Sequence, residues 1–378
     1  MNYSAIDNYI DYLMTSKPDM PLWNIESIRQ GKKPAWNYID GCMMTSLIEM
    51  YKTTGDKKYL NFVLSFVDYY VFEDGTIRGY DPTKYSTDDV CESRILFDLY
   101  KYTNNEKYLK AIKLTYTQIE KHPITKEGNF FHKAIYHDQV WLDGLYMIQP
   151  FYTRYQTEFG GCDYTDIVNQ FKNVKRIMFN EKDGLYYHGY DESRTLFWAD
   201  KKTGLSKNYW LRSIGWYLTG LIDVYSFMDD SKTQQKADIA NIFQDSIKGI
   251  LRYKDPETNM FYQVPNYPDR AGNYLETSGS SMIAYAILKG SRLGVLPPKY
   301  KDIGKDIFEG IAKKYMSIGE DGSLNLKGIC LVAGLGPENN KRRDGSYEYY
   351  ISEPVVENDA KGVGPFIMAY TEIKKLEK

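Results

Sequence analysis

The sequence predicts an all-α protein of the (α/α)6 barrel type, in which six helical hairpins form a toroid around a central cavity. Three observations favour this fold: an internal repeat, apolar residues at helical spacing in each copy, and a helix at each end of the chain that can close the ring. Hairpins stacked in this way bury their apolar faces against their neighbours. We therefore expect one catalytic domain over residues 1–378, with short β-hairpins and loops around the cavity mouth.

The repeat is clearest in the first third of the chain. Residues 49–62 read EMYKTTGDKKYLNF and residues 98–111 read DLYKYTNNEKYLKA, so Tyr51 recurs as Tyr100, 49 residues later (100 minus 51). In the first copy, apolar side chains recur at helical spacing from Met43, TGDKK supplies a turn, and a second apolar face begins at Tyr59. Each copy is therefore one helical hairpin.

Weaker echoes of the repeat follow along the chain. We expect hairpins at 145–155 with 164–178, 210–228 with 236–253, and 280–292 with 300–315, and a last helix at 363–376 that pairs with the first at 5–14. Gly, Pro and alternating aromatic residues at 184–198 and 319–354 favour short strands and loops instead. The N-terminal ends of the inner helices should then frame the cavity.

The composition excludes several classes of protein. The chain has 378 residues, 43% of them hydrophobic and 26% charged, and its formal net charge of -2 gives no general attraction to nucleic acid or to an anionic membrane. Asp7 and Asp11 interrupt the N-terminal segment where a signal peptide needs an apolar run, and no stretch is long enough to span a membrane. We expect neither export by that route nor a membrane partner.

Cysteine usage indicates a reducing compartment. The four cysteines are far apart and form no CxxC pair, which argues against a zinc site and against a disulfide framework. Reduced thiols fit a cytoplasmic protein. The sequence carries no signal for oligomeric state.

Carboxylates lie among aromatic residues near two predicted helix starts. Asp143 stands in WLDGLYM, and Asp88 and Asp89 stand in STDDV, ahead of a helix that we expect from about Arg94. An Asp before a helix is most often an N-cap, which is the favoured interpretation of Asp88 or Asp89 alone and an equal one for Asp143. The alternative is that successive repeats direct these carboxylates into one cavity.

Other polar residues also have two interpretations. Arg212 lies between Trp210 and Trp216, and a guanidinium in apolar surroundings requires a carboxylate from the protein or from a ligand. Tryptophans six residues apart are more often core than binding surface. His188, in YYHGYD, is either a plain loop histidine or a donor in a pocket.

Together with Lys133, these residues suit a pocket for an acidic sugar. Aromatic faces stack on a sugar ring, a cation holds its carboxylate, and an Asp transfers protons. His132 and His137 have no third ligand at metal spacing, and VAGLGP matches no phosphate-binding loop. We predict neither a metal nor a cofactor.

Seven longer stretches, spread in order over nearly the whole chain, resemble the unsaturated rhamnogalacturonyl hydrolases of glycoside hydrolase family 105. They are WNYIDGCM, YSTDDV, GNFFHKAIYHDQVWLDGLYMIQPFY, GLYYHGYDES, FWADKKTGLSKNYWLRSIGW, LETSGSSMIAYAILKG and DGSYEYYISEPVVENDAKGVGPF. The resemblance implies an (α/α)6 barrel. It also implies substrates left by polysaccharide lyases, which are oligosaccharides with a Δ4,5-unsaturated uronic acid at the non-reducing end. Water is the second reactant.

The resemblance also assigns roles to residues. Asp143 is implied as the acid that protonates C4 of the enol ether and then as the base that activates water for C5. Asp88 is implied as the assisting carboxylate. Because Asp89 is adjacent, the alignment of the motif leaves open which of the two takes that role. The positions implied to bind substrate are Tyr38, Lys133, Trp141, His188, Trp210, Arg212 and Trp216. LRSIGW departs from the GRGNGW of other branches, which bears on the subsite beside the unsaturated ring.

The residue types agree with this chemistry. An ordinary glycosidase needs two carboxyl groups, one for the leaving oxygen and one to attack or to activate water. Hydration of a double bond needs one proton donor that later accepts a proton from water. Burial among aromatic residues and a nearby Asp88 favour the protonated form of Asp143, whereas a helix N-terminus favours its ionised form.

Three alternatives remain open. The nearest is an unsaturated glucuronyl hydrolase that acts on ulvan or glycosaminoglycan fragments by the same mechanism. A sugar 2-epimerase would work through paired histidines such as His132 and His188. A non-catalytic sugar-binding protein would have little use for a buried acid, because its desolvation is costly.

Overall fold

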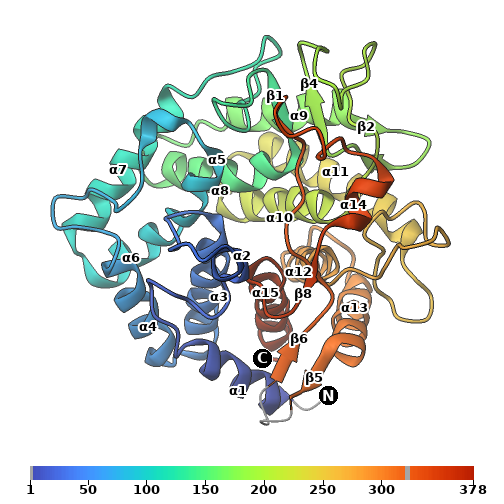
Figure 1. The fold of residues 1–378 in the computed structure, drawn as a ribbon. Helices are drawn as coiled ribbons and strands as arrows, with labels where there is room; N and C mark the ends of the chain where they lie inside the picture. The colour runs from blue at the N-terminus through green and yellow to red at the C-terminus, as the bar shows by residue number, and fades with distance from the viewer. Residues whose placement is uncertain (1–2, 320–323) are drawn as a thin grey trace.

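Six helical segments form a closed inner ring in the part of the chain that the computed structural model describes, residues 3–319 and 324–378 (Figure 1). Each segment packs against the next, and the last returns to the first. In ring order they are α3 (Tyr38–Thr54), α5 with α6 (Thr87–Glu92 and Ile95–Thr103), α8 (Leu142–Glu158), α10 (Leu211–Phe227), α12 (Thr277–Arg292) and α15 (Ala360–Leu376). The ring confirms the expected toroid of hairpins.

Outer helices cover the ring, each beside its inner partner. They are α4 (Lys57–Asp68), α7 (Glu106–Glu120), α9 (Thr165–Met178), α11 (Thr233–Ile250) and α13 (Tyr300–Tyr315). The first helix, α1 (Tyr3–Leu13), lies on α15, where the hydroxyl of Tyr370 donates to Asp7 at 3.1 Å. The two terminal helices pair, as the sequence predicted.

Burial distinguishes the two layers. Residues 211–224 of α10 are all buried, because inner helices have neighbours on every side. The outer helix α9 instead buries a stripe that includes Ile167, Phe171 and Val174. Close approach within the inner ring uses small residues: a Cβ added to Gly220 of α10 would lie 3.2 Å from the Cα of Tyr146 in α8.

Short strands and loops lie above the N-terminal ends of the inner helices, as expected for 184–198 and 319–354. The strands pair as β1 (Gln139–Trp141) with β4 (Gly189–Asp191), β2 (Phe179–Asn180) with β3 (Leu185–Tyr186), β5 (Met316–Ile318) with β6 (Leu324–Leu326), and β7 (Ile329–Cys330) with β8 (Val355–Val356), all antiparallel. Residues 320–323 of the second stretch lie outside the described residues. Minor helices are α2 (Ile25–Gln30), η1 (Pro82–Lys84), η2 (Leu251–Tyr253) and α14 (Tyr347–Ser352).

The expected helix starts need correction in the first two hairpins. The helix expected from about Met43 begins at Tyr38, where the side chain of Asn37 caps it by accepting from the Ile39 N–H at 2.9 Å. The second inner segment begins at Thr87, so Asp88 lies inside a short helix and not in the connection before it. That helix stops just before Arg94, where a second one continues to Thr103. The polar residues at these starts resemble a loop in sequence.

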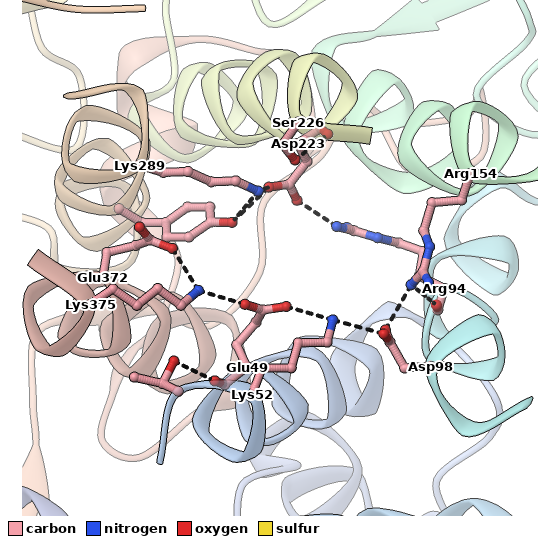
Figure 2. A network of polar contacts seen from close by, with 12 residues as sticks. Glu49, Lys52, Arg94, Asp98, Arg154, Asp223, Ser226, Lys289, Glu372 and Lys375 are labelled. Carbon is pink, nitrogen blue, oxygen red and sulfur yellow. Dashed lines mark hydrogen bonds and ion pairs between the residues drawn. The ribbon is translucent and has the colours of Figure 1, made fainter. Parts of the chain in front are cut away.

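Charged side chains from all six inner segments meet at the end of the ring opposite the helix N-termini (Figure 2). Lys52 joins Glu49 at 2.9 Å and Asp98 at 2.8 Å, and Arg154 joins Asp98 at 2.7 Å. Lys375 of α15 joins Glu49 at 2.7 Å.

The opposite side of the network centres on Asp223 of α10. Its carboxylate is 2.5 Å from Arg94 Nη2, 2.7 Å from Lys289 Nζ and 2.7 Å from the Tyr285 hydroxyl. Burial would raise the pKa of Asp223, but Lys289 and Arg94 reverse this effect and hold the pKa below its usual range. This carboxylate therefore stays ionised in the core.

Asp223→Asn should destabilise the protein by about 3–5 kcal/mol, because it leaves two buried cations without their anion. Urea denaturation compared with the wild type measures this loss. The matched control is Asp230→Asn, which removes a 98% exposed partner of Lys236 and should cost less than about 1 kcal/mol. Similar small effects from both variants would contradict a structural role for the network.

Candidate active site

A cavity of about 260 Å³ opens where the N-terminal ends of α3, α5 and α8 meet the loops above the ring. Five of the nine predicted site residues line it, and they are Tyr38, Asp88, Lys133, Trp141 and Asp143. They come from distant parts of the chain, and closure of the ring brings them together. The cavity is therefore the candidate active site.

Asp143 lies in the first turn of α8, with only 8% of its surface exposed. Its Oδ2 approaches His188 Nε2 at 3.2 Å, but the two atoms are misaligned for a hydrogen bond, and each lacks another partner among the described residues. Buried carboxylate oxygens in proteins are nearly always hydrogen-bonded. The Asp143 side chain lines the cavity, and an exception to this rule in a cavity wall is typical of a functional site.

His188 reaches Asp143 because β1 and β4 pair. Trp141, the residue before α8, pairs with Gly189 in that ladder, and the Leu142 N–H donates to the His188 carbonyl at 3.1 Å. His188 is fully buried, and its Nδ1 is 2.7 Å from the Tyr350 hydroxyl. It does not line the cavity, and it approaches Asp143 from the buried side.

Asp88 forms a tight ion pair on the other side of the cavity. Lys133 Nζ lies 2.5 Å from Asp88 Oδ2, and His132 Nε2 lies 3.7 Å from Asp88 Oδ1. Two hydrogen bonds fix the loop that carries His132 and Lys133 on helix α5. The Thr87 N–H and the Thr87 hydroxyl both donate to the His132 carbonyl, at 3.2 and 2.8 Å. These contacts, made by the residues directly before Asp88 and Lys133, therefore bring Lys133 onto Asp88.

The Asp88–Lys133 ion pair and burial give the neighbouring titratable groups different pKa shifts. Burial would raise the pKa of Asp88, but Lys133 and His132 reverse this and lower it below its usual range. Burial, together with the Asp88 charge, raises the pKa of Asp89 to about 6. Burial lowers the pKa of His132 to about 4, against the pull of Asp88. At neutral pH, Asp88 is an anion and His132 a neutral ring.

Aromatic rings build the wall beside these acids. Trp141 stacks on His132, with ring centroids 4.3 Å apart, and on Tyr136 at 5.0 Å. Below the cavity, Trp216 stacks on Tyr146 at 4.3 Å and meets the edge of Tyr38 at 6.3 Å. Trp216 is only 1% exposed, so it supports Tyr38 from below and does not line the cavity.

Trp210 and Arg212 also lie outside the cavity lining. Trp210 donates its indole N–H to Gln263 at 3.2 Å and packs on His188 at 4.8 Å. Arg212 is 1% exposed; its guanidinium donates to the carbonyls of Cys330 and Leu331, the latter at 3.4 Å. The partners of this buried arginine are thus backbone carbonyls and Ser278, at 3.2 Å, and not the carboxylate that its sequence context suggested.

The capping interpretations of the carboxylates are wrong. Helix α5 has Ser86 at its N-cap and α8 has Trp141, neither with a capping side-chain hydrogen bond. Asp88 and Asp143 both lie in the first turn, each two residues past the N-cap. Negative charge is favourable there without a direct cap, because the helix dipole is positive at that end.

Several residues of the cavity wall carry no signal in the sequence. Among them are Glu26, Asn37, Tyr136, Met147, Val332 and Arg343. Arg343 lies in KRRDGSYEYY, directly before a stretch that carried the family resemblance, but no pattern separates it from Arg342. Tyr350, the partner of His188, belongs to α14, which was expected to be a loop.

The described ranges also bear on metal and membrane binding. Between residues 3–319 and 324–378, His, Cys, Asp and Glu side chains form no group of three or more that suits a metal ion. Within the same ranges, none of the helices has both the length and the apolar character needed to cross a membrane. The four cysteines are free, and three of them are buried.

Comparison with known proteins decides the family. The model of glycosyl hydrolase family 88 matches residues 5–377. A solved family 105 glycoside hydrolase from C. acetobutylicum ATCC 824 is 42% identical, with a TM-score of 0.87 over 90% of this chain and 94% of that chain. The chain belongs to glycoside hydrolase families 88 and 105. It is a glycosidase.

Two further relatives extend the family 88/105 likeness. Protein Atu3128 of Agrobacterium fabrum is 38% identical over 212 residues, which is 55% of this chain and 89% of that protein. The unsaturated glucuronyl hydrolase from Bacillus sp. GL1 is 14% identical and has a TM-score of 0.66 over 92% of this chain and 88% of that one. At that identity the likeness concerns the fold, and it agrees with the predicted (α/α)6 barrel.

Lys133→Gln should raise the pKa of Asp88, because burial then acts on this carboxyl without the ammonium that opposes it. Asp88 would take up its proton at a higher pH, and the anion would be lost in mildly acidic solution where the wild type keeps it. Carbon-13 NMR of the aspartate carboxyl groups against pH measures the shift. Lys84→Gln, at an exposed lysine of the same segment, is the control and should leave Asp88 unchanged. An unaltered Asp88 titration in Lys133→Gln would contradict the assignment.

Proposed function

We propose that this family 88/105 glycosidase removes Δ4,5-unsaturated galacturonic acid from the non-reducing end of rhamnogalacturonan oligosaccharides. The reaction begins by hydration of the C4=C5 double bond. The substrate is a product of polysaccharide lyases in pectin degradation, and we propose a cytoplasmic location on the basis of cysteine usage.

The observation that carries the proposal is the unequal pairing of the two cavity carboxyls. Asp88 is an anion locked to Lys133 at 2.5 Å, whereas Asp143 has no cation within 4.0 Å among the described Lys and Arg residues. A conventional glycosidase uses two carboxyl groups in complementary roles. Here one carboxyl is free to exchange protons, which supports a reaction that needs one acid.

Asp143 would act twice in this reaction. Its carboxyl proton passes to C4, the π electrons form the new C4–H bond, and positive charge develops at C5, where the ring oxygen shares it. Water then adds at C5 and returns a proton to the Asp143 carboxylate, which restores the acid. The resulting hemiketal opens to a C5 ketone, and the hemiacetal left at C1 releases the shortened oligosaccharide.

The surroundings of Asp143 support this role. His188 Nε2 lies 3.2 Å from its Oδ2, and the Tyr350 hydroxyl holds that imidazole in place beside the carboxyl. Trp141 and Tyr38 line the cavity and offer faces for a sugar ring. Asp88, an anion on the same cavity, would stabilise the positive charge that develops on the sugar.

An unsaturated glucuronyl hydrolase is the second candidate. Solved structures with this fold include an unsaturated glucuronyl hydrolase responsible for glycosaminoglycan degradation and one specific for heparin. The mechanism would be the same, and only the sugar next to the unsaturated ring would differ. The family 105 relative, at 42% identity, favours the first candidate.

Asp143→Asn should abolish activity, because an amide cannot deliver the proton to C4. The assay follows the ultraviolet absorbance of the conjugated double bond in an unsaturated galacturonyl-rhamnose disaccharide, which the wild type should remove. We expect a loss of at least about 10³-fold in the variant. Full activity in Asp143→Asn would contradict the mechanism, and essential His132 and His188 would then favour an epimerase.

A substrate panel separates the two hydrolase candidates. We expect cleavage of the unsaturated galacturonyl-rhamnose disaccharide, and little or none of unsaturated chondroitin disaccharide. The opposite preference would assign the enzyme to glucuronyl substrates. Binding of both disaccharides without turnover, measured by calorimetry, would indicate a sugar-binding protein.

A further inference from the structure

We infer that Arg343 binds the carboxylate of the unsaturated uronic acid and is the residue that selects an acidic sugar. This inference rests on the proposed function, because it concerns the substrate of the same cavity. Arg343 was no candidate at the level of sequence. Its place in the cavity wall and the pairing of the other charges there carry the argument.

Among the described residues, the charges that line the cavity leave one cation available for a ligand. Lys133 is committed to Asp88 at 2.5 Å, and Glu26 lies 3.4 Å from Lys361. Arg343 makes no ion pair and no side-chain hydrogen bond with the residues that the structure describes. A substrate carboxylate entering this cavity meets Glu26, Asp88 and Asp143, which repel it unless they are neutralised. The Arg343 guanidinium is the group that can receive it.

Arg212, the arginine that the sequence offered for this task, is not available. It is buried outside the cavity lining, and its guanidinium donates to two carbonyls and to Ser278. Rotation toward a ligand would leave those buried carbonyls unsatisfied. Arg212 instead fixes the segment at Cys330 and Leu331, next to the cavity residues Val332 and Gly334.

The loop of Arg343 is anchored on both sides. The Gly336 N–H donates to the Arg343 carbonyl at 2.8 Å, and the Arg343 N–H donates to the Asn340 carbonyl at 3.2 Å. The next residue, Asp344, pairs with Lys207 at 3.0 Å. These contacts hold the backbone, so that the loss of freedom on binding falls mainly on the side chain.

Gly334 shows where the guanidinium lies. A methyl group placed on Gly334 would be 3.4 Å from Arg343 Nη1 and 3.3 Å from the Trp141 ring, so the two side chains flank this glycine. Trp141 is two residues before Asp143 and lines the same cavity. A uronate stacked there could present its carboxylate to the planar, bidentate guanidinium while C4 faces the acid.

The test compares the free acid with its methyl ester in an unsaturated galacturonyl-rhamnose disaccharide. Arg343→Gln should lower kcat/KM for the acid about 10- to 100-fold, which is the usual range for a lost charge-assisted hydrogen bond. It should change kcat/KM for the ester less than about 3-fold, so the preference of the wild type for the acid disappears. Arg343→Lys keeps the charge and should recover part of that preference.

The neighbouring arginine supplies a matched control. Arg342 pairs with Glu353 at 2.8 Å outside the cavity, and Arg342→Gln should keep the acid-to-ester ratio of the wild type. A thermal melt of each variant verifies folding.

The outcomes distinguish a failure of the role of Arg343 from a failure of the proposed hydrolase function. Turnover by the wild type with an unchanged acid-to-ester ratio in Arg343→Gln overturns the role of Arg343 alone. Collapse of the ratio in Lys133→Gln instead assigns the carboxylate to Lys133 and also overturns it. Absence of turnover of any unsaturated uronide by the wild type overturns the proposed function and this inference together.

Discussion

The ion-pair network that closes the inner ring is the interaction on which the rest of the structure depends. All six inner segments contribute to it, and its charges pair across segments, because Asp98 takes Lys52 of α3 and Arg154 of α8 while Asp223 takes Arg94 and Lys289. A buried ion pair adds little net stability over an apolar contact, but a broken one is costly. The network therefore penalises any arrangement in which one inner helix slides along its axis or leaves the ring.

The same network supports the floor of the cavity. Arg94 pairs with Asp223 below and lies over the ring of Tyr146, 4.7 Å from its centroid. Tyr146 stacks on Trp216, which meets Tyr38 edge-on at the cavity. Closure of the ring at one end thus fixes the shape of the cavity at the other. Trp216 and Arg212, which the family resemblance implied as binding residues, lie outside the cavity lining, and their contacts fix the groups that line it.

The sequence predicted what is periodic or local. The repeat at Tyr51 and Tyr100 indicates hairpins, and Asp143 is conspicuous because it is a carboxylate in an apolar helix start. The start of α5 at Thr87 was not predicted, because Asp88 and Asp89 are typical capping residues and so indicate a helix that begins after them. Contacts that form only when the ring closes could not be predicted from the sequence. Tyr350 is 162 residues from its partner His188, and Cys330, whose carbonyl accepts from Arg212, is 118 residues from it. Arg343 has no local pattern, since only the folded loop separates it from Arg342.

The central claim is that Asp143 protonates C4 of the substrate, so that water enters at C5 and the glycosidic oxygen is never protonated by a second acid. Turnover in heavy water tests it most directly, with the product trapped by reduction and examined by NMR. The account predicts one deuterium at C4, in a single configuration, and none when the product alone is kept in heavy water. A product without deuterium at C4 would contradict it.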